Sequence, residues 1–155
     1  MSCDNPIPVK LEIINLQKLY PINKKRIRKL VRNVLKNEKR DAELNIVFID
    51  NKKIRKINRN FLGHNYATDV ISFSYGEIPH ENAICGEIIV SVEMALHRVQ
   101  EDANLVEDEI ALYVVHGLLH LLGYDDKQKG EAKKMHQREK ELLLQQGYRI
   151  FLPLS

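Results

Sequence analysis

The chain contains no tryptophan, only two cysteines and no long apolar segment. No stretch approaches the roughly 20 consecutive apolar residues that a membrane-spanning helix needs. The N-terminus also lacks the basic-then-apolar pattern of a secretion signal. Cys3 and Cys85 lie far apart and outside any CxxC spacing, so we expect two free thiols rather than a disulfide framework. These absences predict a cytoplasmic protein with no membrane association.

Composition and length are those of an ordinary globular protein. Hydrophobic residues make up 44% of the 155 residues and charged residues 29%. This length suits one hydrophobic core, so we expect a single domain over residues 1–155.

The formal net charge of +3 conceals an uneven distribution of charge along the chain. Residues 1–60 carry 16 Lys and Arg against 6 Asp and Glu, and residues 61–155 carry 8 against 15. A basic half indicates a polyanionic partner, nucleic acid first. A well-solvated helix face explains the same charges equally well, so charge alone leaves both interpretations open.

Apolar periodicity divides the chain into interspersed strands and helices. Strands are predicted at 9–16, 44–49, 68–75 and 83–90, and helices at 24–37, from 52, from 92, at 105–122 and at 127–146. This order predicts an α+β or α/β fold of two or three layers, with a sheet of about four strands.

Several helix ends and faces can also be predicted. Asn23 is the expected cap of the first helix, and Asn104 opens a capping-box pattern in the fourth. The second helix is expected to turn Ile54, Ile57 and Phe61 inward, and Gly147 suits the end of the last helix.

Two histidines mark the apolar helix at 105–122. His116 and His120 are four residues apart, so both imidazoles project from one helical face and can reach one metal ion. Gly123 can end the helix in a left-handed conformation and turn the chain back. That turn would return the carboxylate of Asp126 to the same ion.

The alternative is a pair of core histidines satisfied by backbone carbonyls. Two imidazoles in so apolar a helix need polar partners, because an unpaired buried polar group costs roughly 1–3 kcal/mol. Gly117, in the middle of the helix, costs about 1 kcal/mol relative to alanine and indicates a close approach by another element. The metal site is therefore favoured.

The same spacing of the two histidines and the glycine occurs in metzincin proteases. Gly117 stands where those proteases carry their glutamate general base, so a protease mechanism is disfavoured.

Three ordered motifs, one of them made of two segments, resemble a known family. The segment HGLLHLLGYD at 116–125 resembles the HGxLHLxGYDH signature of YbeY-type endoribonucleases. NRNFLGH at 58–64, TDVISF at 68–73 and GEIIVS at 86–91 resemble that family's other stretches, so the resemblance covers nearly the whole chain.

This resemblance implies a zinc-dependent endoribonuclease that cuts single-stranded RNA. It further implies a role in rRNA 3′-end maturation and ribosome quality control, with rRNA and the small ribosomal subunit as partners. The implied fold is an α+β, zincin-like single domain, in which a sheet of about four strands packs with about five helices and the metal site lies on the central helix.

The chain departs from the family pattern at two positions. Asp126 stands where the third ligand is usually histidine, and aspartate can ligate zinc through oxygen. Asp125 is the rival donor, but it matches a non-ligand position of the signature. The arginine that follows the family's aromatic residue is replaced by Leu62. Arg59, three residues earlier on the same helix, either takes over its role or is a solvated cation.

The sequence therefore predicts metal-assisted phosphodiester hydrolysis with one divalent ion, Zn²⁺, and no identifiable general base. Two alternatives remain: a non-catalytic ribosome-assembly factor with a structural metal, and a metal-dependent hydrolase of another substrate. The predicted site residues comprise the metal ligands His116, His120 and Asp126, the catalytic cation Arg59, and the RNA-binding residues Lys25, Arg28 and Arg32.

Overall fold

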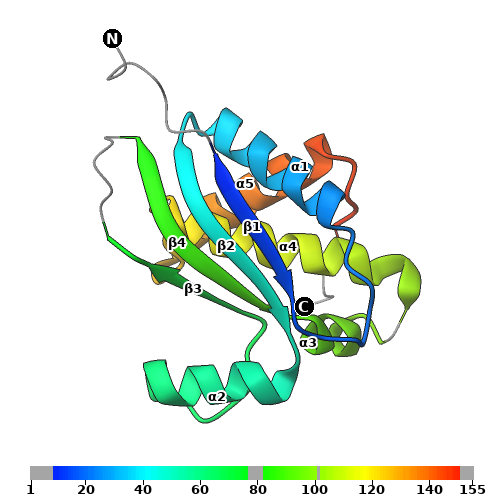
Figure 1. Cartoon of the computed structure of the whole chain (residues 1–155). Coiled ribbons are helices and arrows are strands. Elements are labelled where there is room, and N and C mark those ends of the chain that lie inside the picture. The colour runs from blue at the N-terminus through cyan, green and yellow to red at the C-terminus, as the bar shows by residue number, and fades with distance from the viewer. Residues whose placement is uncertain (1–8, 77–81, 101, 151–155) are drawn as a thin grey trace.

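The computed structural model describes residues 9–76, 82–100 and 102–150. Within them, four strands form one sheet and five helices pack around it, which confirms the predicted α+β class (Figure 1). The elements in chain order are β1 (Lys10–Asn15), α1 (Lys24–Asn37), β2 (Asp41–Ile49), α2 (Asn51–Leu62), β3 (Val70–Ser74), β4 (Ala83–Ser91), α3 (Val92–Arg98), α4 (Ala103–Leu121) and α5 (Lys129–Gln145).

The strand order in the sheet is β1-β2-β4-β3. β1, β2 and β4 run parallel, and the short strand β3 pairs antiparallel with β4 at one edge. The two long strands β2 and β4 form the middle of the sheet and are rich in β-branched and apolar residues, as strands covered on both faces require.

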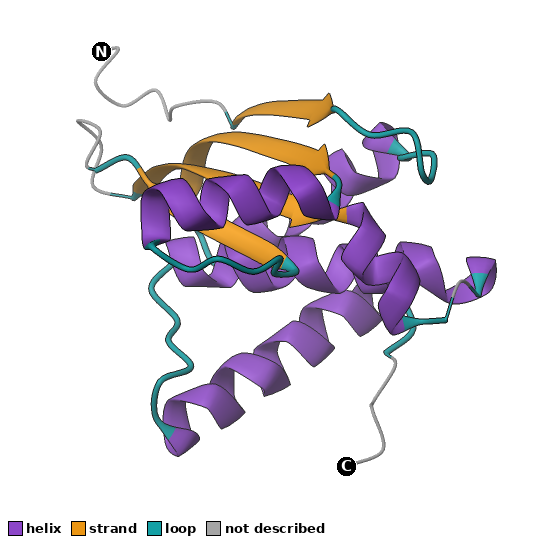
Figure 2. Cartoon of the chain, turned by 90° about the horizontal axis from the view of Figure 1, so that it is seen from below, coloured by secondary structure: helices purple, strands orange, loops and turns teal. Residues whose placement is uncertain are grey.

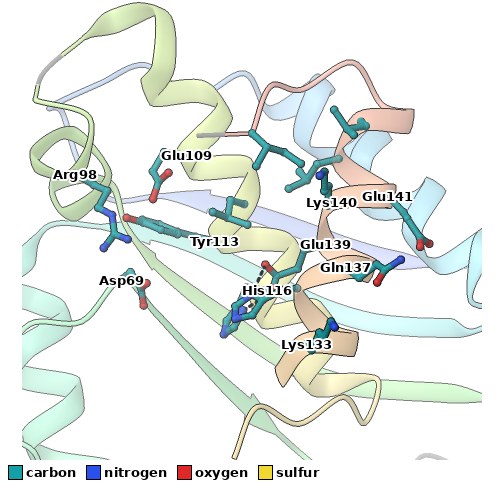
Figure 3. Close-up of a pocket in the computed structure, with 15 residues that line it drawn as sticks. Asp69, Arg98, Glu109, Tyr113, His116, Lys133, Gln137, Glu139, Lys140 and Glu141 are labelled. Atoms are coloured by element: carbon teal, nitrogen blue, oxygen red, sulfur yellow. Dashed lines mark hydrogen bonds and ion pairs between the residues drawn. The ribbon is translucent and has the colours of Figure 1, made fainter. Parts of the chain in front are cut away.

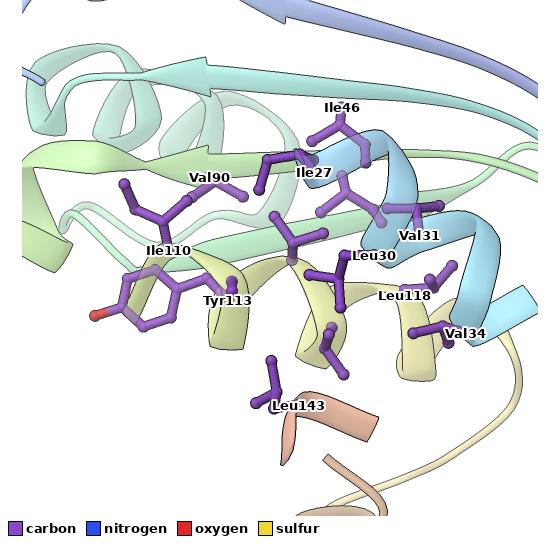
Figure 4. Packing of buried hydrophobic residues seen from close by; sticks show 14 of the residues in the cluster. Ile27, Leu30, Val31, Val34, Ile46, Val90, Ile110, Tyr113, Leu118 and Leu143 are labelled. Carbon is purple, nitrogen blue, oxygen red and sulfur yellow. The ribbon is translucent and has the colours of Figure 1, made fainter. Parts of the chain in front are cut away.

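The two faces of the sheet carry separate apolar clusters, because successive side chains of a strand point to opposite sides. Ile46 and Val90 face α1 and α4 in the larger cluster (Figure 4). Ile71 and Ile89 face the other way and pack with Ile54 of α2. Most of the helical mass lies on one side of the strands in the view from below (Figure 2). α2 and α4 therefore cover opposite faces of the sheet.

Gly117 lets α4 lie directly against the sheet. A Cβ atom at this position would lie 2.8 Å from Ile88 Cγ2 and 2.9 Å from Ser72 Oγ, both of which are too close. Ser72 also donates a hydrogen bond to the Gly117 carbonyl at 2.8 Å. The close approach expected at this glycine is confirmed, and it fixes the height of α4 above β3 and β4.

The predicted boundaries of α1 are confirmed. The Asn23 side chain accepts a hydrogen bond from Arg26 N at 3.0 Å, as expected of an N-cap. The apolar stripe of α1 is fully buried and consists of Ile27, Leu30, Val31, Val34 and Leu35.

Two expectations were wrong. Asp102, rather than Asn104, caps α4; its carboxylate accepts the Asn104 N–H at 3.0 Å, so the helix begins two residues earlier than predicted. Phe61 does not point into a core but is 72% exposed. Its ring meets Phe73 edge-on, and Phe73 lies on the edge strand β3, so no further strand among the described residues covers the pair.

None of the helices in the described ranges is long and apolar enough to cross a membrane. Cys85 is a half-buried free thiol, whereas Cys3 lies outside the described residues.

Candidate metal centre

Three side chains converge where α4 ends and the chain turns back. The Nε2 atoms of His116 and His120 lie 3.1 Å apart. Asp126 Oδ2 lies 3.6 Å from the first of these nitrogens and 3.4 Å from the second. One ligand atom from each residue thus falls within a small common space, and this group can hold a metal ion.

A short turn returns Asp126 to the histidines. Gly123 takes φ +102°, a conformation that L side chains rarely adopt, just after the cap of α4. The next residue, Tyr124, is held by its backbone and by its side chain. Its N–H donates to Leu119 O at 3.0 Å, and its Oη donates to Glu38 Oε1 at 2.9 Å. The loop that carries Asp126 is therefore anchored to the end of α1.

Asp125 takes a different part in the same turn. Its Oδ1 accepts the backbone N–H of Lys127 at 3.1 Å, which stabilises the turn. Asp126, in contrast, directs a carboxylate oxygen toward both histidines. The geometry therefore brings together the predicted ligand set with Asp126, and Asp125 is not part of this group.

A buried carboxylate sets the orientation of His116. Glu139 of α5 is only 4% exposed, and its Oε1 lies 2.6 Å from His116 Nδ1 (Figure 3). Because a carboxylate oxygen accepts, the His116 Nδ1–H donates, and the lone pair of a neutral ring then lies on Nε2. Metal-binding histidines are commonly held in this way by a carboxylate behind the ring.

The surroundings of His116 also change its pKa. Burial lowers the pKa of the imidazole, but the hydrogen bond with Glu139 and the negative charges of Glu139, Asp69 and Asp126 together raise it above the ordinary value. The site therefore favours a positive charge at this point, whether a proton or a metal ion supplies it.

The distances within the group fit a tetrahedral ion. Nitrogen and oxygen ligands about 2.05 Å from a tetrahedral zinc lie about 3.3 Å from one another. The three separations here are 3.1, 3.4 and 3.6 Å. At this distance two ring nitrogens need either a shared proton or a metal ion between them, and the spacing of all three donor atoms fits a divalent metal.

A cleft of about 970 Å³ extends from His116 between α4 and α5 (Figure 3). Three cations line it, Arg98 of α3 and Lys133 and Lys140 of α5, together with the four carboxylates of Asp69, Glu109, Glu139 and Glu141. No sequence motif points to this set of cations, because the three residues lie on separate turns of two helices. The packing of α3 and α5 against α4 brings them into one cleft with His116.

The predicted RNA-binding and catalytic cations lie elsewhere. Arg59 is exposed on α2, which packs on the sheet face opposite α4, so the fold does not bring it into the group with the histidines. Lys25 and Arg32 are exposed on α1. Arg28 is half-buried, and its Nη1 donates to Leu11 O at 3.2 Å. The roles assigned to these four residues stay predictions.

The fold and the site together define a class of α+β proteins. In this class a central helix presents two histidines, and the turn that follows the helix presents a third candidate ligand. A family model described as Endoribonuclease YbeY matches residues 12–147. The chain therefore belongs to the YbeY endoribonuclease family, as the sequence motifs indicated.

Individual proteins agree with this membership. A protein of Alkaliphilus metalliredigens named Endoribonuclease YbeY is 35% identical over 151 residues, which cover 91% of this chain and 97% of that protein. One of the same name from an Anaeromyxobacter species is 37% identical over 107 residues, and the chain spans only 56% of its length. A Thermotoga maritima protein solved in solution shares the fold with a TM-score of 0.61 and 26% identity, over 85% of each chain.

Proposed function

We propose that this protein is a zinc-dependent endoribonuclease that cuts single-stranded RNA and acts in the cytoplasm in rRNA 3′-end maturation and ribosome quality control. His116, His120 and Asp126 hold the metal in this proposal, and the small ribosomal subunit carries the substrate. Family membership and the printed names of the relatives support the reaction class.

The observation that carries the proposal is the convergence of three donor atoms, one of them from His116, which also lines a cleft that contains three cations and four carboxylates. A divalent ion bound there supplies Lewis-acid chemistry, polarising a phosphoryl oxygen and making water more acidic. Three protein donors are the number found in catalytic zinc sites, which leave a coordination position for substrate. A structural zinc site has four protein ligands, so the non-catalytic assembly factor is the less favoured alternative.

The chain's own residues have separate tasks in this reaction. Glu139 holds the His116 ring with its Nε2 lone pair toward the group. Arg98, Lys133 and Lys140 line the cleft, where they can balance the negative charge of the RNA backbone. Arg59 and the α1 residues Lys25, Arg28 and Arg32 would add attraction for RNA outside the cleft.

Cleavage assays test the proposal directly. A labelled single-stranded RNA that carries the 3′ extension of small-subunit rRNA is incubated with zinc-loaded protein, with chelated protein, and with the His116→Ala and Asp125→Ala variants. Cleavage should require metal and disappear in the His116 variant. It should persist in the Asp125 variant, which is the matched control from the same segment. Equal cleavage by the His116 variant and by wild type would contradict the assignment.

A further inference from the structure

The helix α2 ends on the side of the sheet where β3 forms the edge (Figure 1). Large aromatic side chains of this region are exposed. Phe61 is 72% exposed, Tyr66 56% and Tyr75 59%. Phe61 also contacts Phe73 of β3, with ring centroids 6.0 Å apart and the planes at 70°. We call these four residues, Phe61, Tyr66, Phe73 and Tyr75, the aromatic edge. Exposed aromatic groups of this kind on one side of a protein mark an interaction surface.

The segment that displays these rings is firmly held. Asn58 is 2% exposed, and its side-chain amide donates to the backbone carbonyl of Tyr66 at 3.0 Å. The backbone N–H of His64 donates to Asn58 O at 3.2 Å, and Arg55 Nε donates to Asn65 Oδ1 at 3.1 Å. The exposure of Phe61 and Tyr66 is therefore a feature of an ordered turn, in which the rings are presented before any partner arrives.

The charge of α2 indicates what kind of partner fits. The helix, Asn51–Leu62, contains no acidic residue. Its cations are Lys52, Lys53, Arg55, Lys56 and Arg59. The exposed aromatic rings and the cations of α2 together fit a polyanion that has accessible rings of its own. Single-stranded nucleic acid is such a ligand, because its bases are free to stack while its phosphates contact cations. A duplex presents its phosphates but keeps its bases stacked inside.

We propose that the aromatic edge is a base-stacking platform for single-stranded RNA, with Phe61 as its central ring and the cations of α2 contacting the backbone. The inference rests on the proposed function in one respect, that RNA is the substrate. It places a second contact on the sheet face opposite α4, so a bound strand passes around β3 to reach the metal centre. Stacking on aromatic rings is tolerant of sequence, so the platform contributes affinity rather than base recognition.

Binding without cleavage isolates the platform from the chemistry. Fluorescence anisotropy of a labelled oligouridylate is measured with metal-stripped protein in the presence of chelator. The variants are Phe61→Ala, Phe61→Leu, Phe61→Trp and Tyr66→Ala. Leu19→Ala serves as the control, because Leu19 is also exposed, at 52%, but lies before α1. Unchanged thermal midpoints confirm that the variants fold, as the exposure of Phe61 leads us to expect.

The platform predicts that Phe61→Ala and Phe61→Leu each weaken binding at least about 5-fold, the lower end of the effect of losing one stacked base. Phe61→Trp should bind as well as wild type, because a flat ring is restored. In the metal-loaded enzyme, Phe61→Leu should raise KM and leave kcat unchanged.

Two results would overturn the inference, and they can be told apart. If wild type binds the oligonucleotide and Phe61→Leu binds it equally well, the surface serves another partner, such as a protein, while the proposed function stands. If wild type itself binds no single-stranded RNA at any salt concentration, the proposed function fails together with the platform.

Discussion

Glu139 Oε1 lies 2.6 Å from His116 Nδ1 and joins α5 to the metal-binding face of α4. Glu139→Ala removes the group that fixes the ring, and we expect metal affinity to fall about 10- to 100-fold. Competition with a zinc-chelating dye measures this change. Glu131→Ala, at an exposed position in the first turn of the same helix, is the control and should bind metal normally. Equal zinc affinity in the two variants would mean that Glu139 contributes packing and does not support metal binding.

Asp125 and Asp126 should differ sharply in their effect on metal binding. Asp126→Ala removes one of three converging donors, so we expect the bound metal to be lost on dialysis, whereas Asp126→His supplies a nitrogen donor and should retain it. Asp125→Ala disturbs only the hydrogen bond to Lys127 N and should keep its metal. Elemental analysis after dialysis measures all three. If only the Asp125 variant lost its metal, Asp125 rather than Asp126 would be the ligand.

Two glycines in helices provide a matched pair for stability. Gly117→Ala places a Cβ within 2.8 Å of Ile88 Cγ2 and should lower the free energy of unfolding by roughly 1–3 kcal/mol. Gly130→Ala, in α5, meets no atom within 4 Å and should be neutral or raise it by about 0.5–1 kcal/mol. Urea unfolding monitored by circular dichroism compares them. A neutral Gly117 variant would show that α4 can move away from the sheet without cost.

Glu109 should make stability depend on pH. Burial raises the pKa of this carboxyl, an effect that the Tyr113 hydrogen bond and the charge of Arg98 only partly offset. Since the folded-state pKa lies above the unfolded one, the fold disfavours the charged form. The stabilising contribution is therefore present below the ordinary glutamate pKa of about 4.3 and is lost as the pH rises through the raised value.

Glu109→Gln cannot become charged, so its melting temperature should exceed that of wild type at pH 7. The difference should shrink near pH 4, where Glu109 is mostly protonated in both states. Calorimetry at the two pH values measures it, with exposed Glu131→Gln as the control. A difference that grows as the pH falls would contradict the assigned direction of the pKa.

Local sequence patterns predicted the helix faces and the metal-ligand group, because each depends on residues that are close together in the chain. The apolar stripe from Ile27 to Leu35 follows the period of a helix, and the two histidines and Asp126 are brought together by one helical turn and one glycine turn. The contact of Glu139 with His116 joins positions 23 residues apart on different helices, and no spacing rule encodes it. The outward position of Phe61 depends on β3 being the edge strand, which strand order determines and periodicity does not.

The central claim is that His116, His120 and Asp126 form one metal site on which RNA cleavage depends. The most direct measurement is zinc content per chain, taken together with cleavage of single-stranded RNA, for wild type and for the His116→Ala/His120→Ala double variant. We predict about one zinc per chain and metal-dependent cleavage in wild type, and neither in the double variant. Stoichiometric zinc in a folded double variant, or undiminished cleavage by it, would contradict the account.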